Sequence, residues 1–369
     1  HGVIIITGGP GTGKTTTINC IIELLVQEGL KVELAAPTGR AAKRMTETTG
    51  RDAKTIHRLL EYGFGENPGE GFQRDEDNPI KADAVIIDEM SMVDILLVSH
   101  LLKAIVSGTR LIMVGDVDQL PSVGPGNVLR DIIQSNVIPV IQLTEIFRQA
   151  QESMIIVNAH RINHGENPFL NVKDQDFFFD KRETVDDILK TLVDLIARRL
   201  PGFGEYRSLQ DIQILSPMRK GMIGVNNLNV ELQKVLNPPA FNKKEKAAGE
   251  IVYRQGDKVM QIKNNYKLQW NKPGEDGQSY EGEGVFNGDM GFIQDIDKEE
   301  QTLTVLFDDD KTVVYEFSQL DELELSYAIT IHKSQGNEFP VVIIPLISGP
   351  PMLMTRNLLY TGVTRAKEM

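Results

Sequence analysis

The sequence predicts an α/β fold with parallel sheets and a small antiparallel β-barrel inserted near the C-terminal end. Three observations predict it. Residues 2–7, GVIIIT, form an apolar run typical of a buried parallel strand, and a glycine-rich segment and an amphipathic run follow it. A second apolar run, AVII at 84–87, ends at two acidic residues. From about residue 250 to 322, short alternating segments separated by Gly, Asp and Asn indicate antiparallel strands.

Length and composition indicate a globular protein of more than one domain. The chain has 369 residues, of which 41% are hydrophobic and 25% charged. No apolar run reaches the roughly 20 residues that span a bilayer. Cys20 is the single cysteine and therefore forms no internal disulfide. We expect a cytoplasmic protein without membrane contact.

The net charge of −13 argues against a general affinity for nucleic acid, but one segment departs from it. Residues 39–58 are rich in basic side chains. A solvated helix face and a groove for phosphates are both consistent with this stretch. Its charged residues are Arg40, Lys43, Arg44, Arg51, Lys54 and Arg58 against Glu47 and Asp52.

The glycine-rich segment GGPGTGKT at 8–15 is G-x-x-x-x-G-K-T between a predicted strand and a predicted helix that Gly29 closes. In this context the backbone N–H groups surround phosphate oxygens, and the helix N-terminus adds its dipole. Lys14 is expected to reach the β- and γ-phosphates of ATP, and Thr15 to ligate Mg²⁺. The expected nucleotide-binding residues are Gly9, Pro10, Gly11, Thr12, Gly13, Lys14, Thr15 and Thr16.

The two acidic residues after the second apolar run are Asp88 and Glu89. They lie at the carboxyl end of a strand, where open α/β sheets bind their ligands. Asp88 suits the metal ion, and Glu89 can orient and deprotonate an attacking water. Together with the glycine-rich loop, the pair predicts ATP hydrolysis.

Further motifs extend over the whole chain. They are APTGRAAKRM (36–45), TIHRLL (55–60), VGDVDQLPSVGPG (114–126), LTEIFRQ (143–149), LSPMRKG (215–221), TIHKSQGNEFP (330–340) and YTGVTRAK (360–367). With GGPGTGKT and IIDEMSM (86–92), this ordered set resembles superfamily 1B DNA helicases, in particular their RecD-like group.

The resemblance implies two RecA-like P-loop motor domains with a β-hairpin (1B) insertion and an SH3-like β-barrel (2B) insertion. It also implies ATP and Mg²⁺ as cofactors, and a monomer that moves 5′ to 3′ on single-stranded DNA and separates strands at ss/ds junctions in repair or recombination. The implied boundaries are 1–142 for the first motor domain including the hairpin at 61–80, 143–249 with 323–369 for the second, and 250–322 for the barrel.

Residue roles follow from the same resemblance. Gln119 senses the γ-phosphate, Arg148 and Arg365 are arginine fingers, and Glu338 faces the nucleotide. The residues implied to contact DNA are Pro37, Thr38, Arg40, His57, Thr330, His332 and Ser334. For His57 and His332, a neutral structural histidine is the alternative.

Two insertions are interpreted from composition and position. Residues 61–80 have no helical period and carry Tyr62, Phe64 and Phe72 among Gly, Asn, Asp and Pro. This composition is consistent with a β-hairpin that separates DNA strands or with a surface loop. The segments 236–250 and 269–284 are expected to be loops beside the barrel.

Three other functions stay open. A RecD-type subunit of a helicase–nuclease complex would share every motif. A helicase that acts on RNA is possible because backbone contacts read the sugar poorly. A P-loop ATP switch that binds nucleic acid without unwinding it would share the same two sites.

Overall fold

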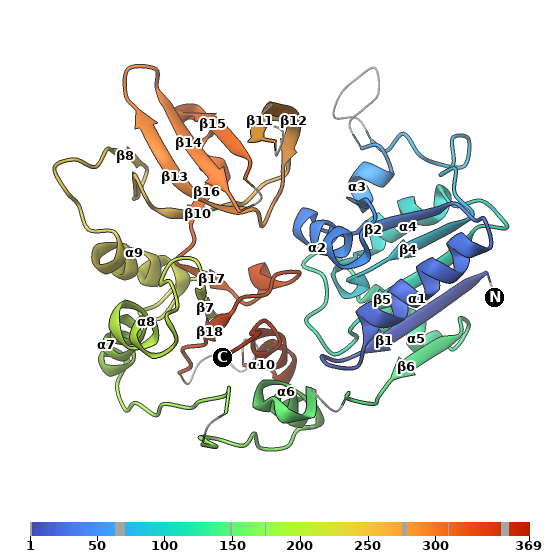
Figure 1. Ribbon diagram of the computed structural model, residues 1–369, viewed down its shortest axis with the longest axis horizontal. Helices are drawn as coiled ribbons and strands as arrows, with labels where there is room; N and C mark the ends of the chain where they lie inside the picture. Colours follow the sequence, from blue (N-terminus) through green and yellow to red (C-terminus); the bar gives the residue numbers. More distant parts are fainter. Residues whose placement is uncertain are drawn as a thin grey trace.

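The computed structural model describes residues 2–62, 71–147, 150–173, 175–274, 279–308, 310–347 and 354–369. Figure 1 shows two halves that face each other. One half is a lobe built from the N-terminal residues. The other half combines an antiparallel sheet with a smaller α/β lobe.

The first lobe is a six-stranded parallel sheet in the order β3-β2-β4-β5-β1-β6. Its strands are β1 (Val3–Gly8), β2 (Val32–Ala36), β3 (Ala53–Thr55), β4 (Ala84–Ile87), β5 (Arg110–Gly115) and β6 (Val140–Leu143). The helices are α1 (Lys14–Gln27), α2 (Gly39–Thr49), α3 (Ile56–Leu59), α4 (Ile95–Lys103) and α5 (Val128–Ser135), with a 3₁₀ turn η1 (Met90–Met92). The strands predicted at 2–7 and 84–87 are therefore confirmed.

Helices cover both faces of this sheet, which explains why its strands read as continuous apolar runs. Along β4, Val85 and Ile87 pack in one cluster and Ile86 packs in another, on the opposite face. Ile86 and Ile87 are fully buried, so truncation of either to alanine would cost about 2–5 kcal/mol of stability. This rigid core places the carboxyl ends of β1, β4 and β5 side by side.

The second lobe contains a three-stranded parallel sheet, β17-β7-β18, so the second motor-type lobe is seen only in part. The strands are β7 (Ile212–Ser216), β17 (Ala328–Thr330) and β18 (Val341–Ile343). The helices are α6 (Met154–His164), α7 (Val185–Asp194), α8 (Leu200–Gly204), α9 (Val225–Leu236) and α10 (Arg356–Val363), with the short turns η2 (Ala150–Glu152), η3 (Leu195–Arg199) and η5 (His332–Ser334). Helices α6 and α10 lie at the boundary with the first lobe (Figure 1).

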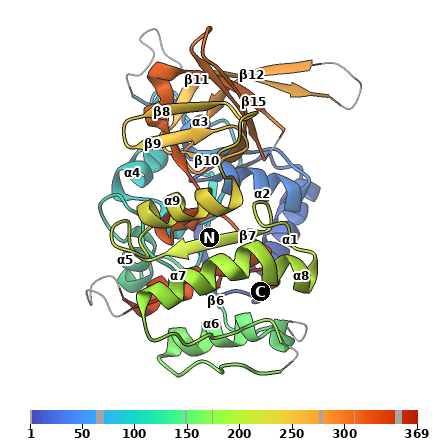
Figure 2. The ribbon, with the colours of Figure 1, turned by 90° about the vertical axis from the view of Figure 1, so that its left-hand side faces the viewer.

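A seven-stranded antiparallel sheet, β12-β11-β15-β14-β13-β10-β16, is inserted between β7 and β17. Its strands are β10 (Lys258–Gln261), β11 (Asn265–Pro273), β12 (Ser279–Val285), β13 (Met290–Asp297), β14 (Thr302–Phe307), β15 (Thr312–Glu316) and β16 (Leu323–Leu325), and η4 (Phe317–Glu322) precedes the last. A separate hairpin joins β8 (Glu245–Ala248) and β9 (Ile251–Arg254). Figure 2 shows this sheet above α7 and α9.

The prediction of a loop at 269–284 was wrong, because β11 and β12 pair there as antiparallel strands. Trp270 lies opposite Gly282, and a Cβ on Gly282 would stand 2.3 Å from the indole ring. Gly282, one of the glycines that suggested a loop, thus makes room for the tryptophan. Likewise, β8 occupies part of the loop predicted at 236–250.

The hairpin predicted at 61–80 falls largely on residues 63–70, which lie outside the described residues. At its base, Tyr62 and Phe72 form an antiparallel bridge. Within the described parts of the chain, no helix is long and apolar enough to cross a membrane.

Candidate nucleotide site and nucleic-acid groove

The glycine-rich loop connects β1 to α1 and is held in shape by its own backbone. Gly11 and Gly13 have φ of 73° and 82°, a left-handed conformation that favours glycine. Thr12 Oγ1 donates to the Gly9 carbonyl at 2.8 Å. Lys14 Nζ donates to the carbonyls of Gly8 at 2.6 Å and Gly9 at 3.0 Å, so the ammonium is positioned directly over the loop. Thr15 and Thr16 are exposed in the first turn of α1.

Asp88 and Glu89 follow β4 at the same sheet edge. The Glu89 N–H donates to Asp88 Oδ1 at 2.8 Å, and Glu89 itself has φ of 53°. Such a left-handed non-glycine residue costs about 1–2 kcal/mol, and strain of this kind clusters at functional sites. Burial, and then the neighbouring Glu89 charge, raise the pKa of Asp88 to about 6, while Lys14 opposes the shift. Burial and the Glu89 charge therefore outweigh the positive charges of Lys14 and Arg44 at this carboxylate.

The loop after β5 adds a third acidic group. Asp116 is 1% exposed, and Gln119 Nε2 donates to its Oδ2 at 3.2 Å. Burial raises the pKa of Asp116, and the Lys14 charge is the largest opposing influence. The motif at 114–126 contains Asp116, but nothing in the sequence identified its partner. The Tyr360 hydroxyl, from α10, donates to Asp116 Oδ2 at 2.7 Å.

Residues of the second lobe cover the glycine-rich loop. His160 on α6 lies with Nε2 3.1 Å from the Pro10 carbonyl. A Cβ on Gly9 would stand 2.8 Å from His160 Cε1, and one on Gly13 would stand 2.2 Å from the ring of Phe147. Both glycines are thus required by close contact as well as by backbone conformation at Gly13. No sequence motif pointed to His160 as a neighbour of this loop, whereas Phe147 lies in the motif LTEIFRQ, next to the predicted finger Arg148.

The two predicted arginine fingers have different outcomes. Arg148 lies outside the described residues. Arg365 is 3% exposed, and its guanidinium donates to the carbonyls of Asn337 at 3.1 Å and Thr361 at 3.2 Å. Its charge nevertheless acts on Tyr360, which contacts the nucleotide site. Arg365 is therefore held inside the second lobe by its hydrogen bonds to backbone carbonyls.

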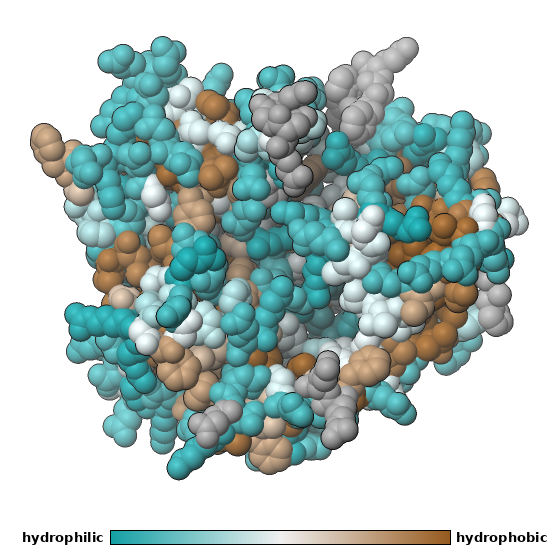
Figure 3. All heavy atoms as spheres, in the orientation of Figure 1, coloured by the Kyte–Doolittle hydropathy of each residue, from teal (hydrophilic) through white to brown (hydrophobic). Residues whose placement is uncertain are grey.

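A groove of about 910 Å³ runs between the first lobe and the antiparallel sheet. Its lining includes eight Lys or Arg and six Asp or Glu, so this surface is positive in a chain of net charge −13. Figure 3 shows largely hydrophilic side chains over the hollow between the two halves. The basic lining residues are Arg40, Lys43, Arg44, Lys54, Arg58, Lys272, Lys311 and Lys367. Most of the basic stretch at 39–58 therefore faces the groove.

Ion pairs cross this groove. Arg40 Nη1 lies 3.2 Å from Asp308 Oδ2, which joins α2 to the end of β14. Arg44 Nη2 lies 2.6 Å from Glu338 Oε1, and Lys367 Nζ lies 3.5 Å from Glu338 Oε2. Glu338, predicted to face the nucleotide, thus lines the groove, although its partner Arg44 also acts on the charge of Asp88.

The residues predicted to contact DNA from the first lobe differ in their exposure. Thr38 follows Pro37 and caps α2, accepting from the Ala41 N–H at 3.2 Å. A Cβ on Gly336 would stand 3.1 Å from Thr38 Oγ1, so the segment 330–340 of the second lobe meets this cap. Burial lowers the pKa of His57, whose ring is enclosed by other rings.

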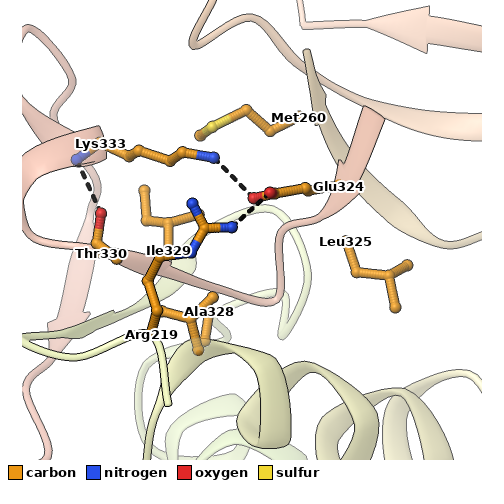
Figure 4. A pocket seen from close by; sticks show the side chains of 9 residues that line it. Arg219, Met260, Glu324, Leu325, Ala328, Ile329, Thr330 and Lys333 are labelled. Carbon is orange, nitrogen blue, oxygen red and sulfur yellow. Dashed lines mark hydrogen bonds and ion pairs between the residues drawn. The ribbon is translucent and has the colours of Figure 1, made fainter. Parts of the chain in front are cut away.

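On the second lobe, Thr330 Oγ1 accepts from the Lys333 N–H at 3.2 Å, and burial lowers the pKa of His332, which favours its neutral form. Ser334 is fully buried and donates to the Ile331 carbonyl at 2.7 Å, so its hydroxyl does not face the groove. Figure 4 shows Lys333 and Arg219 converging on Glu324, at 2.7 and 2.6 Å. Sequence reasoning missed these two cations beside Thr330.

A chain of aromatic rings connects the base of the 61–80 insertion to the antiparallel sheet. Tyr62 lies 4.9 Å from Phe72 and 5.7 Å from Tyr266 of β11, measured between ring centroids. Tyr266 lies 5.6 Å from Phe286, which a Cβ on Gly39 would approach to 3.0 Å. These contacts join the two sides of the groove.

Comparisons with known proteins agree with this arrangement. Residues 1–125 match the AAA domain family, residues 228–307 the ATP-dependent RecD-like DNA helicase SH3 domain, and residues 325–369 the UvrD-like helicase C-terminal domain. The chain is 38% identical over 372 residues to the ATP-dependent RecD2 DNA helicase of Deinococcus radiodurans, covering 100% of this chain and 46% of that protein. It is 29% identical over 402 residues to the RecBCD enzyme subunit RecD of Mycolicibacterium smegmatis, covering 100% of this chain and 67% of that subunit. The chain thus spans less than half of the RecD2 protein.

Solved structures show the fold. A structure of two coordinating Pif1 helicases on forked double-stranded DNA matches with a TM-score of 0.55 at 21% identity, covering 100% of this chain and 86% of that one. Pif1 helicase from Bacteroides, in complex with ADP-AlF3 and ssDNA, matches with a TM-score of 0.53 at 21% identity, covering 99% of this chain and 86% of that one. The architecture is therefore that of a Pif1-like helicase.

Proposed function

We propose that this chain is an ATP-driven motor of the RecD-like group of superfamily 1B helicases, which moves 5′ to 3′ along single-stranded DNA and separates duplex strands; its similarity to a RecD2 helicase and to the RecD-like SH3 domain supports this. One observation supports this most. Arg44 on α2 lines the groove and lies 2.6 Å from Glu338 of the second lobe, and α2 follows β2, the neighbour of the strand β4 that ends at Asp88. Events at one site can therefore reach the other through a single helix, α2.

In this proposal the glycine-rich loop binds the phosphates of ATP. Lys14, already positioned over the loop, exchanges the carbonyls of Gly8 and Gly9 for phosphate oxygens. Glu89 orients and deprotonates the attacking water, and Gln119 senses the γ-phosphate through that water. Arg148 and Arg365 act as arginine fingers, which requires Arg365 to release the carbonyls that it now holds. Fingers of this kind change turnover by about 10³–10⁵-fold.

The residues present fit a magnesium ion. The Thr15 hydroxyl and the Asp88 carboxylate are the hard oxygen ligands that Mg²⁺ prefers. The raised pKa of Asp88 fits too, because a cation would add to the positive charges of Lys14 and Arg44, which burial and Glu89 now outweigh. When bound, the ion neutralises charge on the phosphates.

We propose that single-stranded DNA occupies the groove. Pro37, Thr38 and Arg40 would contact its backbone from the first lobe, and Thr330 and His332 from the second. Ser334 would act by shaping its turn, since its hydroxyl is buried. The Bacteroides Pif1 structure contains ssDNA together with ADP-AlF3, which is the same pair of ligand types.

We further propose the division into motor domains at 1–142 and at 143–249 with 323–369, with an SH3-like domain at 250–322. The antiparallel sheet supports the last of these, because β10 to β15 lie inside it. The insertion at 61–80 is then the wedge that splits a duplex at an ss/ds junction. Glu338 faces the nucleotide indirectly in this proposal, because the ion pair between Glu338 and Arg44 depends on the nucleotide state.

The test is steady-state ATP hydrolysis with and without a single-stranded oligonucleotide, over a series of salt concentrations. We expect DNA to stimulate hydrolysis, and the stimulation to fall as salt rises, because phosphate contacts release counterions. Lys14→Ala should abolish hydrolysis, whereas Lys31→Ala, on an exposed lysine outside the loop, should not. Equal rates with and without DNA would contradict the motor.

A second candidate is a RecD-type subunit that works inside a larger complex. The similarity to the RecD subunit of M. smegmatis favours it. Unwinding by the isolated protein would exclude a requirement for partner subunits. DNA-stimulated hydrolysis without unwinding would instead leave either this subunit or an ATP switch as the function.

A further inference from the structure

Three buried hydrogen bonds join the second lobe to the loop 116–120 of the first. The Tyr360 hydroxyl donates to Asp116 Oδ2 at 2.7 Å. The Leu120 N–H donates to Thr361 Oγ1 at 2.9 Å. Gln335 Nε2 donates to the Leu120 carbonyl at 2.7 Å. Helix α10 and the segment after β17 thus hold both ends of this short loop.

The hydrogen bonds fix the orientation of Gln119. Its Nε2 donates to Asp116 Oδ2, and its Oε1 is buried without a hydrogen-bond partner among the described residues. The reverse amide orientation would set Oε1 against the carboxylate, where two acceptors repel. A buried acceptor without a partner costs about 1–3 kcal/mol, so its retention points to a ligand. Asp116 therefore fixes which atom of the Gln119 amide is left free, namely the carbonyl oxygen.

Tyr360 touches the nucleotide site directly as well as through Asp116. It is fully buried, and a Cβ on Gly9 would stand 3.0 Å from its hydroxyl. Burial, and then the Asp116 charge, raise the pKa of Tyr360, so the hydroxyl stays protonated and remains a donor. One hydroxyl thus lies beside the glycine-rich loop and the carboxylate that orients Gln119.

We propose that Tyr360 is a positioning residue for ATP hydrolysis, which through Asp116 holds the Gln119 carbonyl toward the attacking water. Thr361 and Gln335 hold the backbone of the same loop, so a movement of the groove-lining segment 330–340 shifts Gln119. Occupancy of the groove is thereby linked to the rate of hydrolysis. This inference rests on the proposed motor function.

The test compares Tyr360→Phe with a matched control, Tyr327→Phe. Tyr327 is also a buried tyrosine whose hydroxyl donates to a buried carboxylate, Asp257 Oδ1, at 2.7 Å, away from the loop 116–120. Both variants lose an equivalent hydrogen bond and keep the ring. We expect Tyr360→Phe to lower kcat for ATP about tenfold, as loss of a charge-assisted hydrogen bond predicts, with KM for ATP and Kd for ssDNA within about twofold.

The pH profile separates positioning from a structural role. The Tyr360 hydrogen bond lowers the pKa of Asp116. Its loss should therefore move the acid limb of the kcat profile to higher pH in Tyr360→Phe and leave it unchanged in Tyr327→Phe. If both variants share the same kcat and the same acid limb as the wild type, Tyr360 has no positioning role.

Thr361 tests the link to the groove. Thr361→Val removes the acceptor of the Leu120 N–H at nearly constant volume, and Thr361→Ser keeps it. We expect Val to reduce the ratio of DNA-stimulated to basal hydrolysis at least threefold, and Ser to preserve it. Equal ratios in Val and Ser would overturn the link. A wild-type protein that DNA does not stimulate would contradict the motor function, whereas the kcat comparison at Tyr360 would still decide the positioning role.

Discussion

Substitution of Asp88 by asparagine should stabilise the nucleotide-free protein while it abolishes hydrolysis. Asp88 Oδ1 accepts from the Glu89 N–H at 2.8 Å, and an asparagine oxygen can accept the same bond. The substitution therefore removes the charge and keeps the shape. Functional sites often retain such destabilising groups, because their charge is needed only when the ligand is present.

The magnitude follows from the shift in pKa. Burial and Glu89 raise the pKa of Asp88 from 3.8 to about 6, and at 1.36 kcal/mol per unit this corresponds to about 3 kcal/mol. The folded state binds the Asp88 proton more tightly than the unfolded state does. Protonation of Asp88 therefore adds to the free energy of unfolding below pH 4, and this contribution is lost as pH rises to about 6. At pH 8 the wild type carries the full destabilisation, and Asp88→Asn carries none of it.

The assay is urea-induced unfolding at pH 5 and pH 8 without nucleotide. We expect Asp88→Asn to exceed the wild type by about 2–3 kcal/mol at pH 8, with a smaller gain at pH 5. Asp83→Asn, at an exposed residue just before β4, should show no such gain. Mg²⁺ with ADP should then stabilise the wild type more than Asp88→Asn, because only the carboxylate can bind the ion. An asparagine variant less stable than the wild type at pH 8 would refute this reasoning.

Three other changes test the groove, the insertion and the loop contact. Arg40→Gln should weaken ssDNA binding and reduce the slope of log K against log salt by about 0.7. Asp308→Asn removes the ion-pair partner of Arg40 and should strengthen binding. Unchanged slopes in a salt titration would show that Arg40 does not contact DNA. Replacement of 63–70 by a short linker should preserve DNA-stimulated ATPase and abolish strand separation, and retained unwinding would exclude a wedge there. Gly9→Ala should lower kcat about tenfold, because its methyl group would stand 2.8 Å from His160 Cε1. Gly2→Ala is the control, since nothing lies within 4 Å of its methyl group, and it should leave kcat unchanged. Equal kcat values in the two variants would show that hydrolysis does not need the close approach of Gly9 and His160.

The elements that local chemistry dictates could be predicted from the sequence. The strand, glycine-rich loop and helix at 2–27 form one contiguous segment, so their order alone indicates the phosphate site. The alternating segments after residue 250 likewise gave the strands β13 to β15. At 269–284 the same rules failed, because Gly282 lies in a strand and accommodates Trp270 of the neighbouring strand instead of forming a loop.

Contacts between the lobes could not be predicted, because they depend on tertiary placement. Asp116 and Tyr360 are 244 residues apart, and no local pattern marks them as partners. Ser334 was expected to face DNA, but the turn His332–Ser334 directs its hydroxyl to the Ile331 carbonyl. The sequence motifs identified which segments of the two lobes contact each other. The direction of each side chain within those segments could be seen only in the folded structure.

The central claim is that ATP hydrolysis drives movement along a strand held in the groove. Its most direct test is unwinding of two partial duplexes that differ only in the tail, one with a 5′ single-stranded overhang and one with a 3′ overhang. We predict ATP-dependent separation of the 5′-tailed duplex, none of the 3′-tailed duplex, and none of either by Lys14→Ala. Separation of the 3′-tailed duplex alone, or of neither duplex by a protein whose ATPase responds to DNA, would contradict the account.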